Sequence, residues 1–109
     1  MKKILFVVFI ATFSAFSYAE FYTGNDLKRM CVGQVYEDAI CMGYVTGIYD
    51  TLVATNAQNG ICTGSGGVTV GQIQEITKKY FNEHPEKLHF TAQFLVRSAL
   101  REAFPCPRK

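Results

Sequence analysis

Four cysteines, Cys31, Cys41, Cys62 and Cys106, are the residues of this 109-residue chain whose chemistry is best defined by their number and spacing. Their gaps of 10, 21 and 44 residues lack the short paired spacings of structural zinc sites. An even number of cysteines in a small exported chain is typical of disulfides. We therefore expect two disulfides, which leave no free thiol for nucleophilic catalysis. In so small a domain each bridge contributes about 2–4 kcal/mol of stability.

The two histidines, His84 and His89, stand five residues apart in the polar segment from Asn82 to His89. Two histidines that bind a metal from one helical face are four apart, as in HExxH. Glu83 and Glu86 are explained more simply as solvated loop charges. The sequence therefore predicts no catalytic constellation, no cofactor and no metal site.

A glycine-rich segment, Gly60 to Gly67, is the other stretch that could carry chemistry. A loop of this kind before a helix can hold a phosphate group, but this one lacks the GxxxxGK[ST] pattern. We interpret it as a turn tethered by the disulfide of Cys62.

The N-terminus has the pattern of a secretory signal peptide. Lys2 and Lys3 form a basic n-region, and Ile4 to Phe16 form an apolar h-region. Ser17-Tyr18-Ala19 places small residues at both recognition positions of a signal peptidase. We expect a signal peptide over residues 1–19, cleavage after Ala19 and a periplasmic location, with no membrane attachment after cleavage.

The mature chain would be a single domain over residues 20–109. It would have 90 residues and a formal charge of zero, because the excess of two positive charges belongs to Lys2 and Lys3. A neutral domain gives no reason to expect a nucleic-acid or anionic-membrane partner.

The apolar run from Ala39 to Ala54 predicts a central helix, with Ile40, Tyr44, Ile48 and Leu52 along one side. Gly43 and Gly47 share a face. Because glycine inside a helix costs about 1 kcal/mol relative to alanine, this pair suggests that another backbone packs closely there. We expect Asp50, the one acid in the run, either to accept a buried hydrogen bond or to be partly exposed. The run is shorter than the roughly 20 residues that span a bilayer, which favours a core helix over a membrane or cofactor helix.

Capping and stop signals divide the rest of the chain into three more helices. Thr23 with Asp26, and Thr69 with Gln72, form capping-box patterns that begin helices. Pro85 ends the helix before it, because the residue preceding a proline disfavours helical backbone. The expected helices cover residues 24 to 31 or 32, about 39 to 55, 70 to about 81, and 90 or 91 to 103, with 34–38 as a connection. This pattern predicts an all-α domain, a small four-helix domain stapled by two disulfides.

Helix directions distinguish the three possible cysteine pairings. Successive helices joined by short turns tend to be antiparallel, so the second and fourth helices should point the same way. Cys62 follows the second helix and Cys106 follows the fourth, while Cys31 ends the first helix and Cys41 begins the second. We therefore predict the pairs Cys31–Cys41 and Cys62–Cys106.

The order of several short motifs resembles a known family, the Tai/Rap-type periplasmic immunity proteins. The motifs are Cys41-x-Gly43-Tyr44-x-x-Gly47-x-x-Asp50, Gly67-Val68-Thr69 with Gln72, Tyr80-Phe81, His84-Pro85-Glu86 with Leu88-His89, Leu95-Val96-x-x-Ala99-Leu100 and Phe104-Pro105-Cys106. They cover nearly the whole mature chain. The family neutralises peptidoglycan amidase effectors delivered by type VI secretion systems. Where relatives commonly have a proline after the third cysteine, this chain has Thr63-Gly64-Ser65-Gly66.

The resemblance implies a helical fold, no enzymatic activity, a secreted amidase as partner and a homodimer. Gly43, Tyr44, Gly47 and Asp50 would be structural residues. The alternative is a periplasmic helical protein of another role, such as a stress chaperone.

A segment that plugs the amidase's Cys–His active site should be narrow and well tethered. Pro85 stiffens residues 82–89, whereas ordering the glycine-rich segment 60–67 on binding costs more conformational entropy. We therefore expect the partner-binding residues to be Glu83, His84, Pro85, Glu86, Lys87 and His89.

Overall fold

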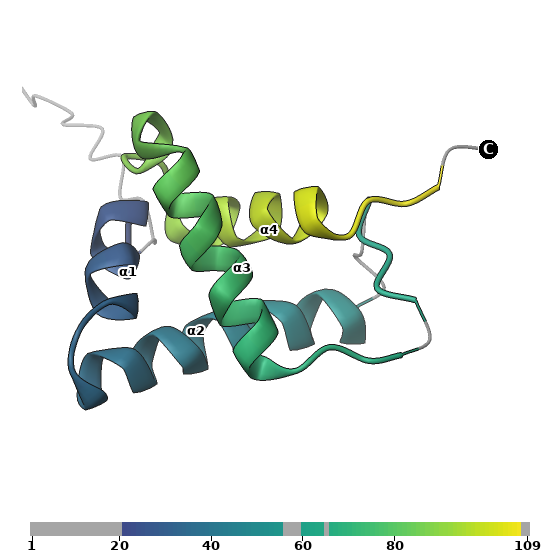
Figure 1. The fold of residues 1–109 in the computed structure, drawn as a ribbon, viewed down its shortest axis with the longest axis horizontal. Coiled ribbons are helices and arrows are strands. Elements are labelled where there is room, and N and C mark those ends of the chain that lie inside the picture. The colour runs from purple at the N-terminus through teal and green to yellow at the C-terminus, as the bar shows by residue number, and fades with distance from the viewer. Residues whose placement is uncertain (1–20, 56–59, 65, 108–109) are drawn as a thin grey trace, which may run out of the picture.

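The computed structural model describes residues 21–55, 60–64 and 66–107, so the predicted signal peptide and Glu20 lie outside the described residues. The elements are α1 (Gly24–Cys31), α2 (Val35–Ala54), α3 (Val70–Glu83), the short 3-10 helix η1 (Pro85–Lys87) and α4 (Ala92–Ala103). Helices α2 and α4 run in the same direction, and α3 crosses both (Figure 1). The predicted all-α, four-helix fold is confirmed.

Both predicted capping boxes are present. The side chain of Thr23 accepts a hydrogen bond from the backbone N–H of Asp26, whose carboxylate accepts from the N–H of Thr23. The side chains of Thr69 and Gln72 make the same reciprocal pair at the start of α3. Each box satisfies two backbone donors that a helix N-terminus leaves without partners.

Two expected helix boundaries were wrong. Residues 35–38 belong to α2 and not to a connection, since Gln34 takes the extended N-cap conformation and the chain turns within residues 32–34. Glu37 and Asp38 occupy the first turn of α2, where negative charge suits the helix dipole. Helix α3 continues past Phe81 to Glu83 and ends at His84, the residue before the proline.

The core is formed where all four helices meet. The largest fully buried side chain is Phe81 of α3, and the other buried apolar residues come from every helix. They include Leu27, Val45, Leu52, Ile73, Tyr80, Leu95, Val96, Ala99 and Leu100. The apolar side of α4 is buried through Leu100, whereas Ala103, its last residue, is exposed.

Two polar side chains of α3 are buried in this core and were not expected there. Gln74 donates from Nε2 to Oδ1 of Asp38 on α2, at 2.5 Å. Thr77 donates its hydroxyl to the carbonyl of Ile73, at 2.9 Å. Both groups are satisfied, as buried polar groups must be to avoid a desolvation penalty.

The predicted disulfide pairing is confirmed. Cys31 and Cys41 join the end of α1 to the first half of α2, with Cα atoms 5.0 Å apart. Both are buried in the core. Cys62 and Cys106 join the segment after α2 to the segment after α4, with Cα atoms 4.9 Å apart. This second bridge lies nearer the surface, with Cys62 exposed and Cys106 half-buried.

One face of α2 is open, contrary to the expectation that another backbone packs on it. Apart from the neighbouring backbone of α2, no atom of the described residues lies within 4 Å of a Cβ atom added at Gly43 or Gly47. Asp50 is exposed, so the expectation of a buried acceptor was wrong and that of exposure correct. The buried side of α2 instead carries Cys41, Val45 and Leu52. Among the described residues, none of the helices combines the length and apolar character needed to cross a membrane.

Candidate functional site

The connection between α3 and α4, residues 84–91, is a hydrogen-bonded turn held by the core. The N–H of Lys87 donates to the carbonyl of His84 at 3.0 Å, and the N–H of Phe90 donates to the carbonyl of Lys87 at 2.9 Å. Pro85 stands at the first turn of η1, where its fixed φ suits a helical start. Leu88 is only 5% exposed and packs into the core. Leu88 is therefore the buried anchor of an otherwise polar segment.

The same turn is fastened to the start of α1 by the backbone. The N–H groups of Gly24 and Asn25 donate to the carbonyls of Phe90 and Leu88, both at 2.9 Å. A Cβ atom at Gly24 would lie 2.3 Å from Cδ1 of Leu95 and 3.0 Å from the backbone of Leu88. Only glycine allows this close approach. The sequence placed Gly24 at a helix start but gave no sign of its contacts with Leu88 and Leu95.

The six predicted partner-binding residues lie together at the end of α3 and along this turn. Glu83, Pro85, Glu86 and His89 are exposed, whereas His84 and Lys87 are half-buried. The ammonium group of Lys87 lies 5.9 Å from the ring centre of Tyr80, within reach of a cation–π interaction. Several polar groups therefore project from a backbone that is held in place.

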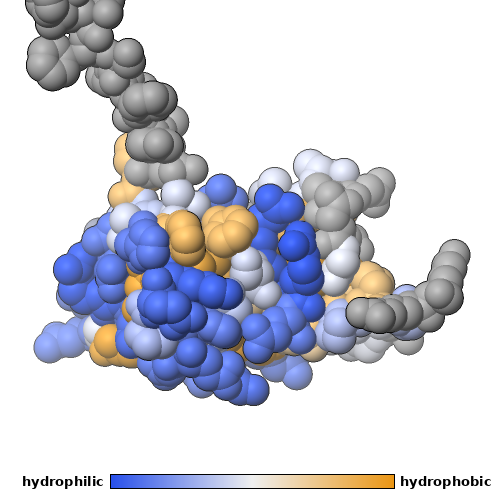
Figure 2. Space-filling view, turned by 90° about the horizontal axis from the view of Figure 1, so that it is seen from above, coloured by the Kyte–Doolittle hydropathy of each residue, from blue (hydrophilic) through white to orange (hydrophobic). Residues whose placement is uncertain are grey.

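Aromatic side chains extend this surface onto α4. The rings of His89 and Phe90 lie 4.3 Å apart, and those of Phe90 and Phe94 lie 5.9 Å apart. Phe90 and Phe94 are 44% and 50% exposed. They line a groove of about 530 Å³ with Tyr80 and Lys87. On the face seen in Figure 2, hydrophobic surface likewise occurs as small areas within mainly hydrophilic surface. Sequence reasoning placed Phe90 at a helix start and missed its exposure.

His84 is held between an aromatic ring and carboxylates. Its ring lies 4.3 Å from that of Tyr80. Its Nδ1 atom is 3.3 Å from Oε1 of Glu86, and its Nε2 atom is 3.5 Å from Oε2 of Glu102. The N–H of Glu86 hydrogen-bonds to its own carboxylate and, with a smaller contribution from His84, lowers the pKa of Glu86 below its ordinary 4.5. The proximity of Glu102, 18 positions beyond His84, gave no signal in the sequence.

The predicted structural residues of α2 lie beside a different groove. Gly43, Tyr44 and Gly47 line a groove of about 570 Å³ between α2 and α4, with Gln93 and Arg97 on its far side. The ring of Tyr44 meets that of Tyr22 edge-on, with centroids 5.6 Å apart. Asp50 is not among the residues that line the groove. Gln93 also lines the groove of Phe90 and Phe94, so the two surfaces adjoin.

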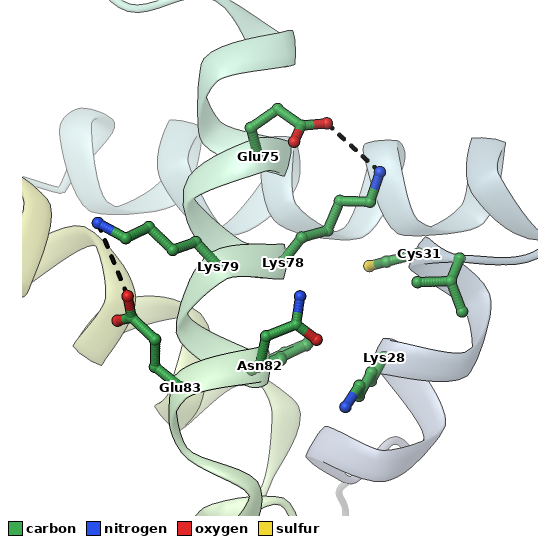
Figure 3. Close-up of a pocket in the computed structure, with 9 residues that line it drawn as sticks. Lys28, Cys31, Glu75, Lys78, Lys79, Asn82 and Glu83 are labelled. Carbon is green, nitrogen blue, oxygen red and sulfur yellow. Dashed lines mark hydrogen bonds and ion pairs between the residues drawn. The ribbon is translucent and has the colours of Figure 1, made fainter.

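A third pocket, of about 420 Å³, lies between α1 and α3 (Figure 3). Four of its five charged side chains form pairs, Glu75 with Lys78 and Lys79 with Glu83, as the dashed lines show. The sulfur atom of Cys31 is held in its disulfide and cannot act as a nucleophile. Among the residues that line this pocket, the side chains do not form a nucleophile–base pair.

These observations define a class of protein: a small helical domain, fixed by two disulfides, with a rigid exposed turn suited to binding. The model of the Rap1a immunity proteins matches residues 23–106, from the N-cap of α1 to the last cysteine. The chain therefore belongs to the Rap1a immunity protein family. A search of curated proteins found no match. The family confirms the resemblance seen in the sequence, and it indicates an immunity protein that acts on an effector protein by binding.

Proposed function

We propose that this protein binds and blocks a peptidoglycan amidase effector of a type VI secretion system, in the periplasm of the cell that makes it. Family membership over residues 23–106 carries the proposal. Two disulfides support an oxidising compartment, and the basic and apolar segments before Ala19 support export. Because cell-wall amidases act on peptidoglycan outside the cytoplasm, an inhibitor exported to the periplasm would meet its target there.

The surface proposed to contact the amidase is the turn after α3, which includes Phe90, together with Phe94 of α4. The turn is fastened by three means: Leu88 in the core, hydrogen bonds to α1, and Pro85 in η1. A segment ordered before binding loses little conformational entropy on binding. Exposed aromatic side chains such as Phe90 and Phe94 are typical of the few residues that dominate interface energies.

The test uses purified type VI amidase effectors, each titrated with this protein while peptidoglycan hydrolysis is measured. For an amidase that is inhibited, the variant K87A/H89A/F90A should weaken binding by at least about 2 kcal/mol, or about 30-fold in Kd. The matched control is V35A/Y36A, which truncates two exposed side chains at the start of α2. If the control weakens binding and the turn variant does not, the contact surface is wrong. If no amidase is inhibited, the proposed target is wrong.

The groove beside Gly43 and Gly47 is the surface we propose for a homodimer. Within the described part of the chain, the space beside these two glycines is open, which leaves room for the helix of a second copy to approach closely. G47L should block that approach without overpacking the single chain, because its new side chain points into open space. Sedimentation at micromolar concentration should show a dimer for the wild type and a monomer for G47L. A wild-type monomer at that concentration would remove the dimer proposal.

A further inference from the structure

The ends of α3 and α4 bring three metal-binding side chains together at one edge of the surface proposed to contact the amidase. Glu83 is the last residue of α3, His84 follows it, and Glu102 lies in the last turn of α4. One ligand atom from each lies within 4.8 Å of the others. Zinc ligands at about 2.0–2.2 Å from the ion are separated by roughly 3.4 Å in tetrahedral geometry. Displacement of the carboxylate oxygens of the two exposed glutamates by at most roughly 1.4 Å would close the remaining gap.

The orientation of His84 is the observation that distinguishes this cluster from an ordinary group of surface charges. Its Nε2 atom is buried and makes no hydrogen bond to any of the described residues. The 3.5 Å separation from Glu102 is that of a charge pair, beyond the usual length of an N–H···O bond. Its Nδ1 atom faces Glu86 instead. An N–H donated from Nδ1 to Glu86 leaves the Nε2 lone pair directed at Glu102, as in the carboxylate–histidine–metal arrangements of zinc sites.

The surroundings of the cluster also favour a cation. Two helix C-termini meet here, and their aligned backbone carbonyls favour positive charge. The ring of Tyr80 packs against His84 and restricts its rotation. The positive group paired with the cluster is Lys79, whose ammonium lies 3.8 Å from Glu83. That pair is exposed, so a divalent ion would displace it at little cost.

We propose that Glu83, His84 and Glu102 bind a zinc ion, with water in the remaining position. An imidazole nitrogen with two carboxylates suits a borderline divalent ion such as Zn²⁺, whereas Ca²⁺ and Mg²⁺ prefer oxygen ligands alone. The ion would join the end of α3 to the end of α4 beside the turn at residues 84–91. This proposal is independent of the amidase, because the three ligands belong to this chain.

The test is a calorimetric titration of the purified, untagged and chelator-treated protein with Zn²⁺ alone. We expect one ion per chain with micromolar or tighter affinity. H84Q should weaken binding at least about 100-fold, because it removes the nitrogen ligand. H89Q is the matched control: it removes the other histidine, which lies outside the cluster, and should leave the affinity unchanged.

Two further variants keep the proposal open to refutation if H84Q fails to fold. E102Q changes an exposed carboxylate and should weaken zinc binding at least about 10-fold, while E75Q, on the outer face of α3, should not. E86Q tests the positioning of the imidazole, so it should weaken binding about 10-fold and also shift the His84 ring-nitrogen NMR signals towards the other tautomer. Absence of saturable binding, equal binding by Mg²⁺, or unchanged affinity in H84Q and E102Q would overturn the proposal.

Discussion

The two long connections of this molecule are fixed by different means. The turn between α3 and α4 is held by the buried Leu88 and by backbone hydrogen bonds to Gly24 and Asn25. In the described part of the connection between α2 and α3, Cys62 is held by the Cys62–Cys106 bridge and by a hydrogen bond of 2.8 Å from its N–H to the carbonyl of Phe104. The first is fastened by one buried side chain and by backbone hydrogen bonds to α1, and the second by a covalent bond beside one buried side chain, Ile61.

The difference bears on which connection is suited to binding. The glycines of the second connection, Gly60, Gly64 and Gly67, have positive φ values of 80°, 72° and 70°. Glycine adopts this conformation readily, but its freedom in the unfolded chain makes ordering costly. The packed turn presents polar and aromatic groups from a backbone that the core already holds. We therefore expect the packed turn to tolerate fewer changes and to contribute more to recognition.

Removal of the Cys62–Cys106 bridge should have the largest effect on stability. Its ends are 44 residues apart, so the chain-entropy model gives about 4 kcal/mol for C62A/C106A, against about 2.7 kcal/mol for closure of the 10-residue Cys31–Cys41 loop. Urea unfolding, followed by circular dichroism, measures both variants. Removal of the buried Cys31–Cys41 bridge also removes core packing. A control series under reducing conditions therefore separates the contribution of loop closure from that of core packing. A loss below about 1 kcal/mol for C62A/C106A would show that the bridge does little to hold this end.

Truncation of Leu88 should have the next largest effect. L88A removes a buried anchor and should lower the free energy of unfolding by about 3 kcal/mol, within the usual range for a buried leucine. V53A is the control, because Val53 is 43% exposed and its truncation should change stability by at most about 0.5 kcal/mol. An equally small effect of L88A would mean that the turn is not anchored by packing.

A single methyl group at Gly24 should test the close approach between the turn and α1. G24A forces an atom against Leu95 and the backbone of Leu88, and overpacking of this kind costs about 1–3 kcal/mol. The same change at Gly43 should have the opposite sign, with a gain of about 1 kcal/mol, since that site is open and alanine is the better helix former. Chemical unfolding of dilute, monomeric protein gives both values. A gain in G24A would refute the close approach.

Local signals in the sequence predicted the fold well because they act over a few residues. The capping boxes at Thr23 and Thr69 and the stop at Pro85 all lie at the ends of the helices they delimit. The cysteine pairing followed from helix directions, which short connections restrict. The start of α2 was misjudged because Val35 to Asp38 carry no capping box, and the helix begins with an extended Gln34 that makes no side-chain cap.

The candidate site could be predicted only where its residues are neighbours in the chain. Residues 83–89 formed an evident polar segment around Pro85, but their anchoring depends on contacts made across the fold. Gly24 meets Leu88 and Leu95, and His84 meets Glu102, only after the four helices pack. Gly43 and Gly47 of α2 show that neighbours in the chain can also mislead. Their spacing placed them on one face of a helix, but it did not reveal whether that face is covered by the same chain or left open.

The smallest effect expected is a difference in acid sensitivity between the two capping boxes. The box of α1 uses a carboxylate, and the N–H of Thr23 lowers the pKa of Asp26 below its ordinary 3.8, with smaller contributions from the hydroxyl of Thr23 and from Arg29. The corresponding residue in the box of α3 is Gln72, which does not titrate. The pKa of Asp26 is lower in the folded state than in the unfolded state. Its contribution to the free energy of unfolding is therefore complete above pH 3.8 and is lost as the pH falls through the folded-state pKa. Glu86, in the packed turn, also has its pKa lowered below the ordinary 4.5, so its contribution to stability is likewise lost in acid.

Urea unfolding at neutral pH and at pH values below 3.8 should therefore show a smaller acid-induced loss of stability in D26N than in the wild type. Q72E, the converse change, should add acid sensitivity at the start of α3. Equal acid sensitivity in the wild type, D26N and Q72E would show that neither box contributes to the pH dependence.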